Sequence, residues 1–199
     1  MSLVKVDITY RLKLITPVHV GTGTGGSGFL DKYVYRQGGC PVIPGSTVKG
    51  RLRAAVTALA RAGVYGAAGV CRETGECTCL VCFIFGRPGQ GRGCLYFEDA
   101  RATESDVNRW LGIRAGIGMD RYRRVAREGA LCTVETVGNE NVVFEGRISG
   151  AVPEEKRQMV IAALKDAFAF NYALGFGKSR GLGWFRAEVA EEEKKCGTP

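Results

Sequence analysis

The sequence predicts an α+β protein of one domain, from two patterns of apolar residues and from its length. Apolar and polar side chains alternate from Leu3 to Ile15, which is typical of a strand with one buried face. Two later segments, beginning near Ser46 and Pro153, carry apolar residues at helical spacing. The 199 residues suit one domain of generous size, and no internal repeat or clear linker divides them.

The first half of the chain is expected to supply a long strand, a short strand and a helix. After the strand at 3–15, the glycine-rich segment 21–28 predicts a flexible loop beside a ligand or partner, and 29–36 predicts a short strand. Ser46 is expected to be the N-cap of the helix. Lys49 and Arg53 share one face of this helix, and the buried stripe is expected to consist of Val48, Leu52, Ala55, Val56 and Leu59.

The second half is expected to add further strands and a second helix. Strands at 94–97, 131–137 and 142–148 precede a helix from Pro153 to about Phe170, and a last strand covers 183–189. The order of elements is then β-α-β-β-α-β, which is that of a ferredoxin-like sheet. The core face of the second helix is expected to consist of Val160, Ile161, Leu164, Ala167 and Phe168.

Clustered positive charge predicts a nucleic-acid-binding protein. The formal net charge is +8, and residues 1–187, which precede the whole of an acidic tail at 190–199, carry 26 basic against 16 acidic groups. Clustered basic residues attract a phosphate backbone, although a merely solvated basic surface is the alternative. One cluster lies in segment 114–130, which has no clean period and is interpreted as a protruding basic arm. The clusters are Lys49, Arg51, Arg53 and Arg61; Arg114, Arg121, Arg123, Arg124 and Arg127; and Lys178 and Arg180.

The sequence gives no sign of a membrane or an exported protein. No apolar run approaches the ~18–20 residues of a membrane-spanning helix. The first ten residues also lack the pattern of a signal peptide. A cytoplasmic protein with no membrane partner is therefore expected.

Four of the eight cysteines lie close together, within segment 71–82. Disulfide bonds in so short a segment are less expected than zinc binding, because Zn²⁺ takes four thiolates tetrahedrally. The last two have the spacing of a chelating half-site. Segment 71–82 therefore predicts a zinc-binding insert, with reduced, unliganded thiols as the alternative. The four ligands would be Cys71, Cys77, Cys79 and Cys82.

Residues 175–183, Gly-Phe-Gly-Lys-Ser-Arg-Gly-Leu-Gly, predict a loop that holds phosphate. Glycine allows positive φ and lets a phosphate approach the main chain, whose N–H groups form an anion-binding nest in such turns. Lys178 and Arg180 add positive charge. The loop is not a P-loop, which needs a strand before it and a helix after it. The alternative is a turn that only reverses the chain.

Several motifs, taken in order, resemble those of one protein family. They are Thr16-Pro-Val-His-Val-Gly21, Pro44-Gly-Ser-Thr-Val-Lys-Gly50, Phe85-Gly86, Ile117-Gly-Met-Asp-Arg121 with Glu128-Gly-Ala-Leu131, and the loop at 175–183. Together they resemble the RAMP superfamily of CRISPR-associated proteins, specifically the backbone subunit of type III effector complexes. The resemblance runs from about Val4 to Val189, and the cysteine cluster is similar to that of some zinc-bearing backbone subunits.

The resemblance implies a ferredoxin-like or RRM-like core that stacks head to tail along a CRISPR guide RNA in prokaryotes. The implied partners are guide RNA, target RNA and other effector subunits, including copies or paralogues of this chain. In the family, the helix start and the glycine-rich loop hold guide phosphates, and an arm inserts between guide and target. The RNA-binding candidates are then Ser46, Lys49, Arg53, Gly175, Gly177, Lys178, Ser179, Arg180 and Gly181, with Arg121 and Arg123 in the arm.

The resemblance also implies a catalytic residue. Many such subunits cleave target RNA through an aspartate after the first strand, and Asp31 is at the matching position. A carboxylate can hold Mg²⁺ or another divalent ion while water and phosphate fill the remaining positions. Two alternatives stay open. In the first, Asp31 pairs with Lys32 in a purely structural subunit; in the second, His19, the only histidine, is the base of a guide-processing endoribonuclease rather than a packed residue.

Overall fold

The structure, a computed structural model, describes residues 2–25, 29–66, 71, 77–89, 91–104, 107–138 and 142–192. Parts of three predicted segments lie outside these residues: the end of the glycine-rich segment, the turn between Cys71 and Cys77, and most of the acidic tail. Within the described ranges the fold is α+β, as the sequence predicts, with three α-helices, one more than the two expected, and a larger share of strand.

The largest sheet has seven strands built around the N-terminal one. Strand β1 (Leu3–Leu14) pairs antiparallel with β12 (Val143–Pro153) on one side and β13 (Phe185–Glu191) on the other. The far edge of β12 pairs with both β8 (Leu95–Phe97) and β9 (Ala100–Ala102). The sheet then continues from β9 through β5 (Cys40–Ile43) to β4 (Arg36–Gln37).

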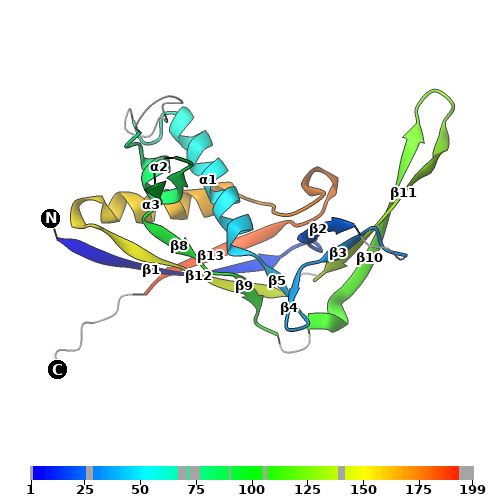
Figure 1. Ribbon diagram of the computed structural model, residues 1–199, viewed down its shortest axis with the longest axis horizontal. Coiled ribbons are helices and arrows are strands. Elements are labelled where there is room, and N and C mark those ends of the chain that lie inside the picture. Colours follow the sequence, from blue (N-terminus) through cyan, green and yellow to red (C-terminus); the bar gives the residue numbers. More distant parts are fainter. Residues whose placement is uncertain are drawn as a thin grey trace.

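Three helices lie on one side of this sheet (Figure 1): α1 (Gly45–Arg61), α2 (Leu80–Phe85) and α3 (Glu154–Phe170). The alternation in β1 explains the core, because its apolar face turns toward the helices. The ring of Tyr10, on that face, lies 5.0 Å from the ring of Phe168 on α3. The predicted core face of α3 is buried throughout, whereas Leu59 at the end of the α1 stripe is only half-buried. The buried residues of the β1 face are Val6, Ile8, Tyr10, Leu12 and Leu14.

Helix α1 begins one residue before the predicted cap, so the assignment of Ser46 as N-cap is wrong. Pro44 occupies the N-cap position with φ −58° and ψ 139°, and no side chain of the helix itself caps the end. The N–H of Gly45 donates instead to Oδ1 of Asp99, at 2.8 Å. Only glycine fits at position 45, because a Cβ there would lie 2.2 Å from the carbonyl oxygen of Phe97. The helix start is thus docked on β8 and capped from a distant segment.

The second sheet contains the predicted arm. Strands β10 (Leu111–Asp120) and β11 (Val125–Val137) form a long hairpin that projects from the body of the protein (Figure 1). At its tip, Oδ1 of Asp120 accepts hydrogen bonds from the N–H groups of Tyr122 (2.9 Å) and Arg123 (3.0 Å). Asp120 therefore shapes the turn of the arm.

The base of this sheet corrects the prediction for the glycine-rich segment. Gly21–Gly25 form strand β2, which pairs with β3 (Lys32–Val34), so this part is not a free loop. Glycine lacks a side chain but keeps the main-chain donor and acceptor that pairing requires. Strand β3 in turn pairs parallel with β11 at Val134. A two-stranded hairpin of β6 (Gly86–Arg87) and β7 (Gly91–Arg92) stands apart from both sheets.

A buried ion pair on the outer face of β1 gives a test of the fold. Asp7 is only 4% exposed, and its carboxylate accepts from Arg147 on β12 and from Lys5, whose Nζ lies at 2.8 Å. These partners hold the pKa of Asp7 well below its usual range. Replacing Asp7 with Asn is expected to lower the free energy of unfolding by about 2 kcal/mol at pH 7.

The pH dependence of this loss has a definite sign. A carboxyl with a depressed pKa stabilises the folded state above its unfolded pKa of about 4 and loses that contribution as the pH falls. The gap between wild type and Asp7→Asn should therefore shrink from pH 5 to pH 3 in urea unfolding. Glu145→Gln, which breaks the exposed pair with Arg11, is the control and should change stability by less than about 1 kcal/mol. Equal losses in both variants would contradict the assignment.

Candidate nucleic-acid interface and metal centre

An open cavity of about 370 Å³ gathers residues from widely separated parts of the chain. Strands β2 and β3 supply one wall, the loop after α3 supplies another, and Thr47 comes from the start of α1. We call this cavity the cleft. Its lining includes His19, Gly21, Thr22, Asp31, Lys32, Thr47, Gly175 and Phe176.

Asp31 lines the cleft and is held by the arm strand β11. Its Oδ2 accepts from the N–H of Thr133 at 2.6 Å and from the hydroxyl of Thr133 at 3.0 Å. These hydrogen bonds, first from the main-chain N–H and then from the hydroxyl, lower the pKa of Asp31. In the part of the chain that is described, Asp31 forms no ion pair with Lys32. The carboxylate is thus ionised, exposed and fixed in position.

His19 is almost fully buried at the edge of the same cleft. Its Nδ1 lies 2.6 Å from the carbonyl oxygen of Glu135. Because a carbonyl only accepts, Nδ1 carries the proton and Nε2 keeps its lone pair. A Cβ on Gly21 would lie 2.6 Å from Nε2, so glycine is needed beside the ring. Burial lowers the pKa of His19, which favours the neutral imidazole.

Glu135 connects the two candidate residues through β11. Its carboxylate accepts from the N–H of Val34 on β3 (2.9 Å) and from Arg36 (2.6 Å). Burial alone would raise the pKa of Glu135, but these two hydrogen bonds lower it. The carboxylate of Glu135 thus fixes β3, the strand that carries Lys32, and the main-chain carbonyl of Glu135 orients His19. Thr133, two residues earlier on β11, holds Asp31. The geometry of the cleft therefore depends on one face of β11.

The predicted phosphate loop lies against the end of this cleft. Gly175 has φ +79°, and a Cβ there would lie 2.3 Å from the carbonyl oxygen of His19, so the loop docks on the strand end through glycine. The next residue, Phe176, donates its N–H to that same carbonyl at 2.9 Å. Its ring carries two cations: the Nζ of Lys32 lies 4.0 Å and the guanidinium carbon of Arg180 lies 4.8 Å from the centroid.

Four of the nine main-chain N–H groups of the loop at 175–183 donate inside the protein. The N–H groups of Phe176, Arg180, Leu182 and Gly183 all donate to carbonyl oxygens. Positive charge therefore reaches a ligand mainly through side chains. Lys178, Ser179 and Arg180 form a short turn that is flanked by Gly177 and Gly181, whose backbones are both in the left-handed conformation. The amide nest expected for the loop is in this respect only partly available.

The remaining predicted RNA-binding residues do not line the cleft. Ser46 is exposed in the first turn of α1. Lys49 and Arg53 lie further along that helix and line a different groove. Arg121 and Arg123 are exposed at the tip of the arm, in the turn that joins β10 to β11. The predicted residues thus occupy three places: the cleft and its loop, the side of α1, and the arm.

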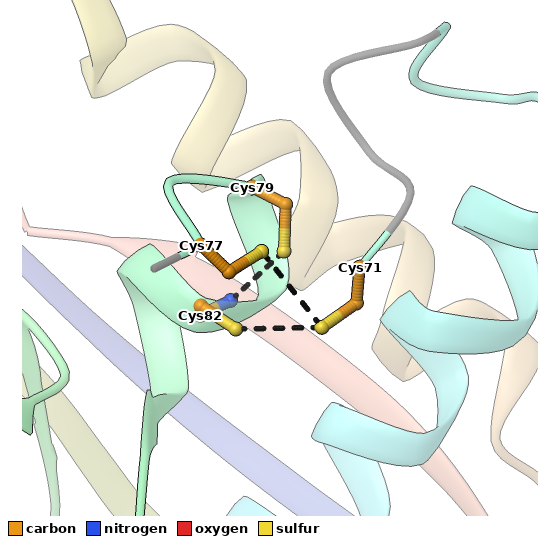
Figure 2. A group of neighbouring side chains, drawn as sticks. All are labelled: Cys71, Cys77, Cys79 and Cys82. Atoms are coloured by element: carbon orange, nitrogen blue, oxygen red, sulfur yellow. Dashed lines mark hydrogen bonds between the residues drawn. The ribbon is translucent and has the colours of Figure 1, made fainter. Parts of the chain in front are cut away.

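The four clustered cysteines converge on one point beside α2 (Figure 2). All four Sγ atoms lie within 4.8 Å of one another. The Sγ of Cys71 lies 3.5 Å from that of Cys82 and 3.9 Å from that of Cys77. Cys79 is the N-cap of α2, and its Sγ accepts from the N–H of Cys82 at 3.4 Å.

This arrangement fits a metal ion such as zinc. Zn–S bonds of about 2.3 Å in a tetrahedron require sulfur atoms about 3.8 Å apart, close to the spacings observed. Burial raises the pKa of the Cys82 thiol to about 12 and also raises that of Cys79. A bound cation reverses this, because a coordinating thiol is deprotonated. The four thiols therefore form a donor set that could hold such an ion through protein ligands alone.

Sequence reasoning did not identify Lys32, Thr133, Glu135 or Phe176 as parts of the site. Thr133 and Glu135 lie two apart in a predicted strand, so they face the same side, and polar pairs in such a strand indicate a hydrogen-bonded neighbour. Phe176 lies between two glycines in the loop, where an aromatic residue is not needed for a turn. These two patterns are the signs in the sequence that could have identified the missed residues.

Comparison with known proteins identifies the family. The model of the RAMP superfamily matches residues 11–186, which is most of the chain. No curated protein matches the chain. Among the described helices, none has the length and apolar character to cross a membrane. The matched range includes the cleft, the cysteine cluster, the arm and the glycine-rich loop, and the chain accordingly belongs to the RAMP superfamily of CRISPR-associated proteins.

Proposed function

We propose that the chain is a guide-RNA-binding backbone subunit of a type III CRISPR effector complex, and that it also cleaves bound target RNA. Membership of the RAMP superfamily gives a CRISPR-associated RNA-binding role. The observation that supports the more specific role, RNA cleavage by a backbone subunit, is the cleft, where Asp31 and Lys32 meet the glycine-rich loop. Such a subunit acts in the prokaryotic cytoplasm, with guide RNA, target RNA and other effector subunits as partners.

The arrangement of the main sheet supports a ferredoxin-like core for this subunit. The strands β13, β1, β12 and β8 are neighbours in that order. In the chain, α1 lies between β1 and β8, and α3 lies between β12 and β13. This is the arrangement expected for β-α-β-β-α-β, with the arm and the cysteine cluster as insertions. Copies or paralogues of the chain would stack along one guide.

In this proposal, the guide backbone lies along the basic edge of the molecule. Lys178 and Arg180 on the loop, and Lys49 and Arg53 on α1, neutralise phosphates, while Ser46 offers a hydroxyl at the helix start. Arg180 stacks on Phe176, which fixes the plane of its guanidinium. The arm presents Arg121 and Arg123 between guide and target. The contacts are with the backbone and carry little base preference.

Cleavage in the cleft needs a nucleophile aimed at phosphorus and groups that stabilise the charge developing on the phosphate. Asp31 would hold a divalent ion such as Mg²⁺ through its exposed carboxylate, with water and phosphate oxygens as the other ligands. No cluster of three metal-ligating side chains in the described ranges includes Asp31, so RNA must complete the coordination. Lys32, held over Phe176, adds a cation beside the phosphate.

Two other functions compete with this one. In a purely structural subunit, Asp31 would only hold Thr133, and cleavage would be absent or supplied by a neighbouring paralogue. In a guide-processing endoribonuclease, the free Nε2 of His19 would take a proton from the 2′-hydroxyl without a metal. The neutral imidazole at the edge of the cleft is the observation that keeps the second alternative open.

Binding of guide RNA is expected to depend strongly on salt. Each phosphate contact with single-stranded RNA adds about 0.7 to the slope of log affinity against log salt concentration. The double variant Lys49→Ala, Lys178→Ala should therefore have a slope smaller by about 1.4, measured by fluorescence anisotropy with single-stranded RNA. Lys165→Ala, which removes an exposed lysine from α3, is the matched control. An unchanged slope in the double variant would show that neither lysine contacts the RNA backbone.

A further inference from the structure

A second basic groove lies along α1 and shares no lining residue with the cleft. It encloses about 390 Å³. Lys49 and Arg53 from α1 form one side, Arg87 and Arg92 from the β6–β7 hairpin form the other, and Tyr96 of β8 lies at its edge. Its lining in the described part of the chain contains no carboxylate. Lys49, Arg53 and Arg92 therefore line the groove with no acid in its described lining.

The hairpin that forms one wall of the groove is fixed by close main-chain packing. It pairs through Gly86 with Arg92 and through Arg87 with Gly91. Gly86 has φ +78°, and a Cβ there would lie 2.6 Å from the main-chain nitrogen of Gly93. The fold thus uses glycines to place two arginines opposite α1.

Phe85 in the lining of the groove packs on Phe97 behind it, and the edge of the groove is aromatic. The rings of Phe85 and Phe97 stack with centroids 5.7 Å apart, and the Nζ of Lys49 lies 5.8 Å from the centroid of Phe97. Tyr96, which precedes Phe97 on β8, is 65% exposed. An exposed aromatic ring beside arginine and lysine is the combination that binds single-stranded nucleic acid, because the cations hold phosphates while a base stacks on the ring.

We propose that this groove is a second RNA-binding site, which takes a single-stranded segment with phosphates on Arg53 and Arg92 and a base on Tyr96. The proposal rests on the RNA-binding role proposed above and extends it to the β6–β7 hairpin. Helix α1 connects the two sites, since Thr47 lines the cleft and Arg53 lines the groove, about 9 Å further along the helix axis. One strand of RNA can therefore run from the cleft along α1 into the groove.

Crosslinking and variants test the proposal on the full chain. Single-stranded RNA that contains 4-thiouridine, irradiated with the wild-type protein, should crosslink to the tryptic peptide 93–101, which contains Tyr96. Tyr96→Ala should weaken binding of the same RNA about tenfold, whereas Tyr96→Phe, which keeps the ring, should leave it nearly unchanged. Arg92→Ala should reduce the salt slope by about 0.7. Both side chains are exposed, and Lys165→Ala is again the control.

The outcomes separate this site from the function on which it rests. Crosslinks in peptide 93–101, with losses in Tyr96→Ala and Arg92→Ala, support the groove. RNA binding that depends on Lys178 and Arg180 but is unaffected by both groove variants, with no crosslink in 93–101, overturns the groove and leaves the proposed function standing. Absence of RNA binding by the wild-type protein overturns both. If an acidic polypeptide binds the groove and RNA does not compete with it, the proposal is also contradicted, since the groove would then be a protein-docking surface.

Discussion

Replacing Asp31 with asparagine is expected to lower the rate of target RNA cleavage by about a hundredfold or more, with guide and target binding unchanged. The amide has nearly the same size, but it is neutral and a poor ligand for a hard cation. A group that acts mainly in the transition state changes the chemical rate rather than affinity, and losing one such group typically costs about 10²–10³ in rate. The measurement is single-turnover cleavage of labelled target by the assembled guide complex.

Matched controls distinguish the three functions. Asp166→Asn removes an exposed carboxylate from α3 and should cleave at the wild-type rate. If His19 is the base, a chelator of divalent ions should leave cleavage intact and His19→Ala should abolish it. An unchanged rate in Asp31→Asn would falsify the metal mechanism. If the wild-type complex does not cut target RNA with any divalent ion or without one, the purely structural function is supported.

The pH profile provides an independent check on the same assignment. Thr133 lowers the pKa of Asp31, so its carboxylate is ionised throughout the range from pH 5 to 8 and should produce no inflection there. Burial lowers the pKa of His19 below its usual value, and a base acts only when unprotonated. A histidine mechanism would therefore show a rate that rises with pH through an acidic pKa and disappears in His19→Ala.

Loss of the cysteine cluster should produce the largest change in stability. One zinc per chain is expected by elemental analysis, and Cys79→Ser should lose the metal and unfold at a lower temperature. Because structural zinc binds with about 10–16 kcal/mol in small finger domains, its loss is expected to lower the free energy of unfolding by several kcal/mol. The effect should be large because Cys79 also caps α2, whose buried residues join the core.

Another cysteine provides the control for this experiment. Cys40 is exposed and lies outside the cluster, so Cys40→Ser should keep both the zinc and the stability. Removal of zinc from the wild-type protein by a chelator should reproduce the loss seen in Cys79→Ser. Full stability of a metal-free Cys79→Ser protein would show that the four thiols have no structural metal.

The sequence could predict those parts of the fold that depend on local periodicity. Alternation in β1 and helical spacing in α3 each identified the buried face, because burial on one side imposes a period that neighbouring residues share. The same reasoning failed at Ser46, and it did not indicate that Asp7, on the polar face of β1, is buried. The cap of α1 comes from Asp99, and the charge of Asp7 is buried because Arg147 on another strand pairs with it. Both depend on residues far away in the chain.

The candidate site likewise combines residues found from local patterns with residues placed by contacts between distant parts of the chain. Compact patterns in the sequence indicated the glycine-rich loop and the cysteines, and the family resemblance implied Asp31. The residues that position them were not predictable in this way. Thr133 follows Asp31 by 102 residues, and Phe176 meets Lys32 only after α3 has returned the chain to the first sheet. A single sequence carries no record of such contacts until the strands are paired.

Because β11 is continuous from the cleft to the tip, the length of the arm can change independently of the chemistry of the cleft. The strand is anchored at its inner end, where Val134 pairs with Lys32 and Thr133 and Glu135 hold Asp31 and His19. Toward the tip, among the described strands, β11 pairs with β10. Residues can thus be added or removed in cross-strand pairs near Val125 without altering the register at Thr133. In the proposed function, the arm could thus fit duplexes of different depth while the cleft stays the same.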